Sequence, residues 1–180
     1  MARASAMHFK TPRLQLRDLT PDDASRMHAI ESDPVAVRYQ SYAPCTLDEC
    51  GMYIARDIAQ RACNGSCFDL GVTLSDELVG RVGLDIKLPE RSVGELWFIL
   101  DRRHWGQGLM LEAARALVTF GLSTHSLHRV FLECDPRNVG AIRLAEKLGM
   151  KREGDLRQHV FIKGEWCDST FFGLLASDFV

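Results

Sequence analysis

Three strand-like stretches lie close together in the middle of the chain, with only short turns between them. Residues 68–75 and 78–87 flank a tight turn at Asp76-Glu77, and residues 92–101 follow a turn at Pro89-Glu90. Connections this short join antiparallel neighbours, because a parallel pair needs a crossover of about a dozen residues or more. The middle of the chain therefore predicts an antiparallel meander, and the remaining elements are arranged around it.

Helix signals stand on both sides of this meander. Thr20-Pro21 begins one helix before it, and the capping box at residues 46–49 (TLDE) begins a second. After it, residues 108–124 and 138–149 carry apolar residues at helical spacing. Further strands are expected at residues 13–18, 128–134, 151–162 and 166–176.

The element order β-α-α-β-β-β-α-β-α-β-β is that of a single α/β domain with one mixed, mostly antiparallel sheet of about seven strands. With 180 residues the chain is long enough to bury one full core. We expect this domain to span residues 7–180, and we expect residues 1–6 to be a flexible N-terminus.

Charge and cysteine content narrow the functional classes. The 22 basic and 24 acidic residues give a net charge of −2, which supplies neither the basic footprint of a nucleic-acid-binding protein nor a polybasic membrane anchor. No apolar run approaches the ~20 residues of a membrane span, and the first ten residues lack the apolar segment of a signal peptide. The six cysteines contain no CxxC pair, so we interpret them as reduced, small buried residues rather than as a metal site. These features predict a soluble, cytoplasmic protein without a metal, nucleic-acid or membrane partner.

A glycine-rich turn, Arg103–Met110, separates the last strand of the meander from the next helix. Gly106 and Gly108 let the backbone approach a ligand closely, and the positive end of the helix lies there, so a phosphate or diphosphate is the expected ligand. Position 111 is a leucine where a dinucleotide fingerprint needs glycine or alanine, and the Gly-Lys-Ser/Thr of a P-loop is missing. Both nucleotide sites are therefore excluded, and the alternative to a phosphate site is a plain strand-to-helix turn.

At this turn the sequence resembles the GNAT (Gcn5-related) N-acetyltransferases, whose acetyl-CoA loop is Q/R-x-x-G-x-G/A. Arg103, Gly106 and Gly108 match its three fixed positions. The strand GELWFILD before the loop is similar to the family's fourth strand, and residues 138–150 carry EKLGM where the family has EKLGF. The opening TPRLQLRDLTPDDA resembles the branch of ribosomal-protein N-terminal acetyltransferases (RimJ/RimL type), and the resemblance covers residues 10–176.

The resemblance implies direct transfer of an acetyl group from acetyl-CoA to an amine, either a protein N-terminus or a small amine. It also implies a sheet that splays apart between the strands at 92–101 and 128–134. Glu95 stands where many members carry a catalytic carboxylate, which acts as a base through a water or after burial has made it more basic; the alternative is an ordinary strand glutamate. The expected coenzyme-binding residues are Phe98, Ile99 and Leu100 on the strand, Arg103, Trp105, Gly106, Gln107, Gly108, Leu109 and Met110 in and after the loop, and Asn138.

Some of these residues have a structural alternative. Asn138 also suits a helix cap, Arg103 also suits the surface, and Trp105 also suits packing against the sheet. Phe172 stands where this branch is expected to carry a tyrosine that protonates the leaving thiolate, and Ala141 replaces the family's serine. The proton donor is therefore unidentified, and the alternative function is a non-catalytic acetyl-CoA-binding or sensing module.

The acceptor amine is not readable from the sequence. Its choice is expected from the first two helices and from the connection at residues 31–46, where Asp33, Tyr39 and Tyr42 are candidates for lining a pocket. A homodimer is also compatible with the resemblance.

Overall fold

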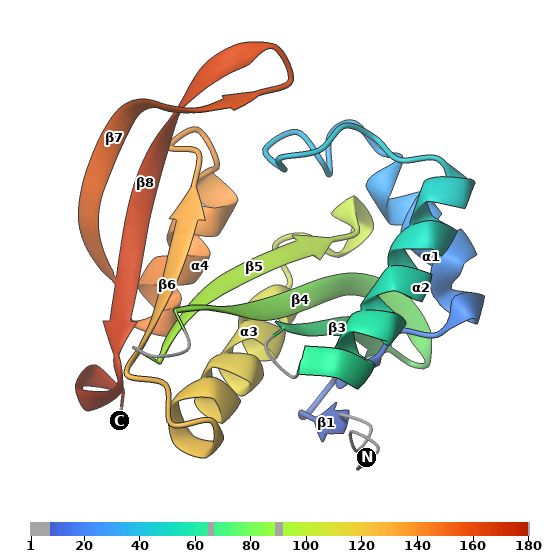
Figure 1. The fold of residues 1–180 in the computed structure, drawn as a ribbon, viewed down its shortest axis with the longest axis horizontal. Helices are drawn as coiled ribbons and strands as arrows, with labels where there is room; N and C mark the ends of the chain where they lie inside the picture. Colours follow the sequence, from blue (N-terminus) through green and yellow to red (C-terminus); the bar gives the residue numbers. More distant parts are fainter. Residues whose placement is uncertain (1–7, 65–66, 89–91, 180) are drawn as a thin grey trace.

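The computed structural model describes residues 8–64, 67–88 and 92–179, and their strands form one mixed sheet in the order β1-β2-β3-β4-β5-β6-β8-β7 (Figure 1). All neighbours are antiparallel except β5 and β6. The strands are β1 (His8–Lys10), β2 (Gln15–Asp18), β3 (Cys67–Leu74), β4 (Glu77–Leu88), β5 (Val93–Leu100), β6 (Arg129–Cys134), β7 (Lys151–Ile162) and β8 (Glu165–Leu175). The predicted meander is confirmed as β3-β4-β5. The flexible start expected at residues 1–6 and the turn expected at Pro89-Glu90 lie outside the described residues.

In the part of the chain that the structure describes, the sheet has eight strands, where about seven were expected. The additional strand is β1, whose three residues are too few to show the alternation by which longer strands are recognised. Phe9 of β1 pairs with Leu16 of β2, and its ring packs edge-on against Phe120 with 5.1 Å between centroids. Contacts with distant residues, rather than a local pattern, therefore fix this strand.

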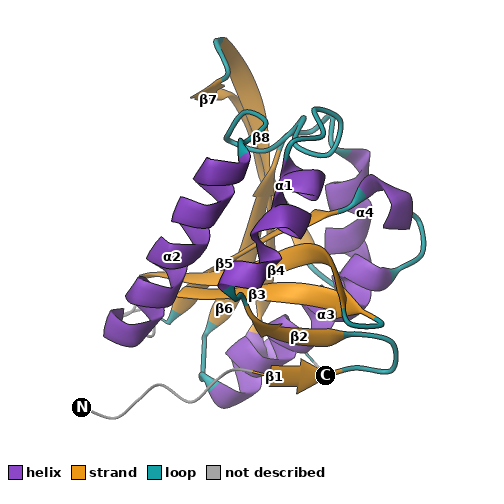
Figure 2. Ribbon diagram, turned by 90° about the vertical axis from the view of Figure 1, so that its right-hand side faces the viewer, coloured by secondary structure: helices purple, strands orange, loops and turns teal. Residues whose placement is uncertain are grey.

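The described residues form four α-helices, which cover the two faces of the sheet. They are α1 (Ala24–Glu31), α2 (Leu47–Asn64), α3 (Leu109–Thr119) and α4 (Val139–Leu148). Helices α1 and α2 lie on one face and α3 and α4 on the other (Figure 2). The apolar face expected for the third helix is confirmed, because Leu109, Ala113 and Leu117 are buried, and a π-helical turn at Phe120–Thr124 extends that helix to its predicted end.

Each face of the sheet has its own apolar cluster. The larger cluster, which includes Leu96 and Leu100 of β5, packs against α3 and α4. The smaller one, which includes Ile99 together with Met27 of α1 and Ile54 of α2, lies on the opposite face. Successive side chains of β5 therefore point to opposite sides of the sheet, as the pleat requires.

The second helix begins at the predicted capping box. Thr46 N–H donates to Glu49 Oε2 at 2.7 Å, and Glu49 N–H donates to Thr46 Oγ1 at 3.3 Å. Cys45 and Cys50, on either side of this box, bring their Sγ atoms to 2.8 Å, in the positions of a hydrophobic staple. Box and staple together fix the direction in which the connection from α1 meets α2.

No helix among residues 8–64, 67–88 and 92–179 is long and apolar enough to cross a membrane. Within the same part of the chain, no group of three or more His, Cys, Asp or Glu side chains is arranged to hold a metal ion.

Candidate active site

The sheet opens between its two halves, as the family resemblance implies. Strands β5 and β6 pair over three residue pairs, the last being Glu95 with Phe131. Beyond this point β5 stays paired with β4 as far as Leu100, whereas β6 stays paired with β8 as far as Cys134. Beyond Glu95 the facing edges of β5 and β6 are therefore not paired with each other, and Figure 1 shows the two strands diverging.

Backbone hydrogen bonds show which residues of β5 face this opening. Asp101 N–H, just after the strand, donates to Val79 O of β4 at 2.8 Å. Because backbone groups alternate between the two edges of a strand, Ile99 then faces β4, whereas Phe98 and Leu100 face the opening. Of the three strand residues expected beside the coenzyme, two present backbone groups there, and the backbone of Ile99 is engaged with β4.

Two side chains donate to carbonyl groups on the open edge of β5. Gln40 Nε2 donates to Phe98 O at 3.0 Å, and Trp105 Nε1 donates to Leu100 O at 2.9 Å. Trp105 nevertheless remains about half exposed, so this residue both bonds to the sheet and presents a surface beside the opening. Both bonds confirm the direction in which these two carbonyls point.

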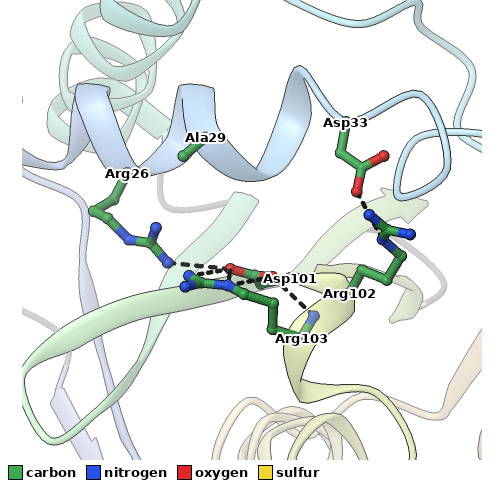
Figure 3. Close-up of a pocket in the computed structure, with 6 residues that line it drawn as sticks. All are labelled: Arg26, Ala29, Asp33, Asp101, Arg102 and Arg103. Atoms are coloured by element: carbon green, nitrogen blue, oxygen red, sulfur yellow. Dashed lines mark hydrogen bonds and ion pairs between the residues drawn. The ribbon is translucent and has the colours of Figure 1, made fainter.

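Asp101 fixes the start of the glycine loop. Its Oδ1 accepts from Arg103 N–H at 2.9 Å, and its Oδ2 accepts from Arg103 Nη2 at 2.7 Å and from Arg26 Nη2 at 3.1 Å. These hydrogen bonds, with that of the Arg103 side chain foremost, lower the pKa of Asp101 to about 2. Figure 3 shows both arginines converging on Asp101. The three residues line a cavity whose volume is about 320 Å³. Arg103 thus braces the loop, and its expected contact with phosphate stays a prediction.

The loop itself presents backbone to its surroundings. Gly106 and Gly108 have φ angles of 75° and 74°, which favour glycine. A Cβ at Gly106 would meet no described atom within 4 Å, and one at Gly108 would meet Arg13 Nη2 at 3.7 Å. No described side chain caps α3, which has eleven residues. Leu109 and Met110 bury their side chains in the core, so the group they can offer a ligand is the backbone N–H.

A long-range tether holds this loop from the other side, and no local sequence pattern indicates it. Arg13 Nη1 donates to Gln107 O at 3.0 Å, and Arg13 Nε donates to Glu112 Oε2 at 2.6 Å, across 99 positions of sequence. Thr11 Oγ1 donates to Glu112 Oε1 at 2.5 Å. Burial raises the pKa of Glu112, but these hydrogen bonds outweigh burial and leave the pKa below its ordinary value. The segment before β2 is therefore tied to the start of α3.

A larger cavity, of about 630 Å³, lies on the α1/α2 face and has Glu95 in its wall. The Glu95 side chain is 24% exposed, and its Oε2 lies 2.8 Å from Lys87 Nζ. Tyr42 lines this cavity, as expected for the connection between α1 and α2. Asp33 lines the smaller cavity instead, and Tyr39 lines neither.

The same wall contains a buried guanidinium that the sequence did not single out. Arg81, only 3% exposed, lies between two carboxylates, with Glu31 Oε1 at 2.9 Å and Asp69 Oδ2 at 3.3 Å. Its guanidinium also lies over the rings of Tyr53 and Trp97, at 4.4 and 5.1 Å from the centroids. Burial raises the pKa of Glu31, and the positive charge of Arg81 opposes that rise. This cluster therefore forms a charged and aromatic part of the cavity wall.

The structure shows the contacts of Asn138, at the start of α4, and of Phe172 on β8, two positions whose roles the sequence left open. Asn138 Oδ1 accepts from Ala141 N–H at 3.1 Å, so Asn138 caps the helix, and its coenzyme contact stays a prediction. Phe172 pairs opposite Leu132 and is buried in the α3/α4 cluster. Position 172 therefore presents no group to the opening, and Ala141 has no side chain that can donate a proton.

The chain is similar over most of its length to known N-acetyltransferases. Residues 13–151 match the acetyltransferase (GNAT) domain. The chain is also 30% identical over 175 residues to the uncharacterized N-acetyltransferase p20 of Bacillus licheniformis, which covers 94% of this chain and 96% of that protein. It is therefore an acetyl-CoA-dependent acetyltransferase. It belongs to the GNAT family.

Solved structures share the fold at lower identity. RimL, a ribosomal L7/L12 α-N-protein acetyltransferase in complex with coenzyme A, matches with a TM-score of 0.86 and 16% identity, over 94% of this chain and 98% of that one. A spermidine N-acetyltransferase from Vibrio cholerae, in complex with CoA and spermine, matches with a TM-score of 0.80 and 22% identity, over 93% and 98%. Since these two proteins are named for different acceptors, the shared fold does not select the amine.

Proposed function

We propose that the protein moves an acetyl group from acetyl-CoA directly to a primary amine at the opening between β5 and β6. The observation that carries this proposal is that the open edge of β5 leads straight into the glycine loop and the uncapped start of α3. An amide-containing arm can pair with Phe98 and Leu100 as an added strand would, while the N–H groups that follow Gly108 bind the diphosphate. When bound, the coenzyme supplies an activated acetyl carbon and a thiolate leaving group. Gln40 Nε2 now takes the position on Phe98 O that an amide N–H of the arm would take.

The acceptor would arrive from the α1/α2 face, through the cavity that contains Glu95. Four carboxylates (Glu31, Glu49, Asp85 and Glu95) and three cations (Arg56, Arg81 and Lys87) line it, and the excess of one negative charge favours an ammonium group. Lys87 Nζ, 2.8 Å from Glu95, illustrates that this carboxylate can hold a primary ammonium. Before attack the ammonium must lose a proton, which Glu95 accepts directly or through a water. A protein N-terminus and a polyamine, the acceptors for which RimL and the spermidine enzyme are named, both meet this requirement.

The test is thiol release from acetyl-CoA in the presence of a panel of N-terminal peptides, polyamines and other small amines. We expect release that depends on one class of acceptor, with a product heavier by one acetyl group. Tight acetyl-CoA binding without release for any amine would instead favour a coenzyme-sensing module.

A substitution in the loop tests the coenzyme site separately. Gly108→Val places a branched side chain in the path of the diphosphate, and we expect at least about a tenfold loss of acetyl-CoA affinity. Gly164→Val is the matched control, because Gly164 also has a positive φ, of 86°, but lies in the β7–β8 turn. Equal affinities for the two folded variants would contradict the loop assignment.

A further inference from the structure

A bulge interrupts β7 between Leu156 and Val160. Gln158, inside it, has a φ of 48°, and its backbone N–H donates to Asp168 Oδ1 of β8 at 2.8 Å. Bulges bend a strand, redirect the neighbouring side chains and occur often beside active sites. The side chain redirected here is that of His159, which reaches two residues on other strands of the sheet.

His159 forms a compact polar cluster with Glu133 of β6 and Ser169 of β8. His159 Nδ1 lies 3.1 Å from Glu133 Oε1 and 3.0 Å from Ser169 Oγ, and Ser169 Oγ donates to Glu133 Oε1 at 2.6 Å. The ring packs edge-on against Phe171, with 5.6 Å between centroids. Ser169 is buried, whereas the His159 side chain is 36% exposed. The imidazole ring is thus held by contacts at Nδ1, and part of the side chain is exposed to solvent.

These contacts decide the tautomer. The Ser169 hydroxyl gives its proton to Glu133, so its oxygen and the Glu133 carboxylate are both acceptors for His159 Nδ1. The proton of neutral His159 therefore lies on Nδ1, and Nε2 carries the free lone pair. A serine nucleophile would need its hydroxyl at the nitrogen opposite the carboxylate. Ser169 and Glu133 lie at the same nitrogen, so the cluster orients a base rather than activating a serine.

The cluster faces the acceptor side of the opening. Val130 and Leu132 of β6 point into the α3/α4 cluster, so Glu133, between Leu132 and the end of the strand, points to the opposite face. Glu133 lies two residues beyond Phe131, the last residue of β6 that pairs with β5. Glu95 on β5 lines the cavity on that same α1/α2 face. His159 and Glu95 therefore lie on one face of the sheet, each on its own side of the opening.

We propose that His159 is a second catalytic residue, which carries a proton from the acceptor nitrogen to the leaving sulfur, with Glu133 and Ser169 as positioning residues. This inference rests on the proposed function. An acceptor ammonium loses two protons as the N–C bond forms and the C–S bond breaks, and the electron pair of the C–S bond stays on sulfur. Nε2 of His159 takes one proton and returns it to the thiolate, whereas Glu95 passes the other to water. This route supplies the proton donor that Phe172 and Ala141 do not provide.

The first test is the His159→Gln variant, which keeps an amide donor but has no basic nitrogen. We expect kcat to fall by about a hundredfold, with acetyl-CoA affinity within about twofold of the wild-type value. His28→Gln, on α1, is the matched control and should keep both kcat and acetyl-CoA affinity.

The Glu133→Gln variant distinguishes a positioning role of Glu133 in catalysis from a purely structural role. Among the described residues, Glu133 is the charged group in contact with the ring, since Ser169 and Phe171 of β8 are neutral. Its charge favours the imidazolium that forms when His159 takes the proton, so Glu133→Gln should lower kcat, though less than His159→Gln does, and leave acetyl-CoA affinity within about twofold of the wild-type value. An unchanged kcat, or a loss of acetyl-CoA affinity that parallels the loss of kcat, would overturn the assignment of Glu133.

Nitrogen-15 NMR of the wild-type protein measures the tautomer of His159 directly and needs no variant. We expect the His159 ring to carry its proton on Nδ1, and the opposite tautomer would overturn the proposal. If the wild-type enzyme releases thiol with an acceptor and His159→Gln does so at the same rate, His159 is excluded and the proposed function stands. If the wild-type enzyme releases none with any amine, both proposals fail.

Discussion

Asp101 offers a stability test whose size follows from the structure. The pKa of this carboxyl lies at about 2 against an ordinary 3.8, with the hydrogen bond from Arg103 as the largest cause. That difference corresponds to about 2.4 kcal/mol in favour of the folded state at neutral pH. Solvent screens part of it, because the Arg103 side chain is mostly exposed. We therefore expect Asp101→Asn to lower the free energy of unfolding by about 1–2 kcal/mol at neutral pH.

The stabilisation that Asp101 provides depends on pH. Since the pKa of Asp101 is lower in the folded than in the unfolded chain, the stabilisation is complete above the unfolded value of 3.8 and is lost as the pH falls through about 2. Urea unfolding followed by tryptophan fluorescence should show a difference between wild type and variant that roughly halves between neutral pH and about pH 3. Asp178→Asn, which removes the partner of the exposed Lys151, is the control and should change little. An equal loss at both pH values, or none at neutral pH, would refute the reasoning.

Three further substitutions test other parts of the site. Arg81→Met removes the cation between Glu31 and Asp69, and we expect urea unfolding to show a loss of about 3–5 kcal/mol. Phe172→Tyr puts a hydroxyl into an apolar cluster, so it should cost about 1–3 kcal/mol and leave kcat unimproved, and a rise in kcat would mean that position 172 reaches the opening. Glu95→Gln should lower kcat about a hundredfold while acetyl-CoA affinity, measured by calorimetry, stays within about twofold; wild-type rates across pH would remove Glu95 from the mechanism.

Local patterns predicted most of the fold because they describe contacts between near neighbours in sequence. Alternation and short turns predicted the β3-β4-β5 meander, and the TLDE box predicted the start of α2 at Leu47. The three-residue strand β1 was not predicted, because its position depends on contacts with Leu16 and Phe120 rather than on a pattern in its own residues. The opening between β5 and β6 was expected from the family resemblance, and no periodicity in either strand indicates it.

The functional site likewise contains residues that local sequence patterns predict and residues that they do not. The glycine loop is a local feature, so its residues could be named from the sequence. Arg13 reaches Glu112 across 99 positions and Arg81 reaches Glu31 across 50, and no spacing rule links either pair. A role for His159 was not predicted for another reason: the direction of its side chain depends on a β-bulge, and Asp168 on the next strand stabilises that bulge. Side chains that are placed by tertiary contacts carry no signature in the residues beside them.

Residue-specific amide hydrogen exchange, with and without saturating acetyl-CoA, tests most directly whether the coenzyme lies along the open edge of β5. The N–H groups of Phe98 and Leu100 face the opening, whereas that of Ile99 faces β4. We expect acetyl-CoA to slow exchange at Phe98, Leu100 and the start of α3, and to leave Ile99 nearly unchanged. Unaltered exchange at Phe98 and Leu100 in the presence of bound acetyl-CoA would contradict the proposed site.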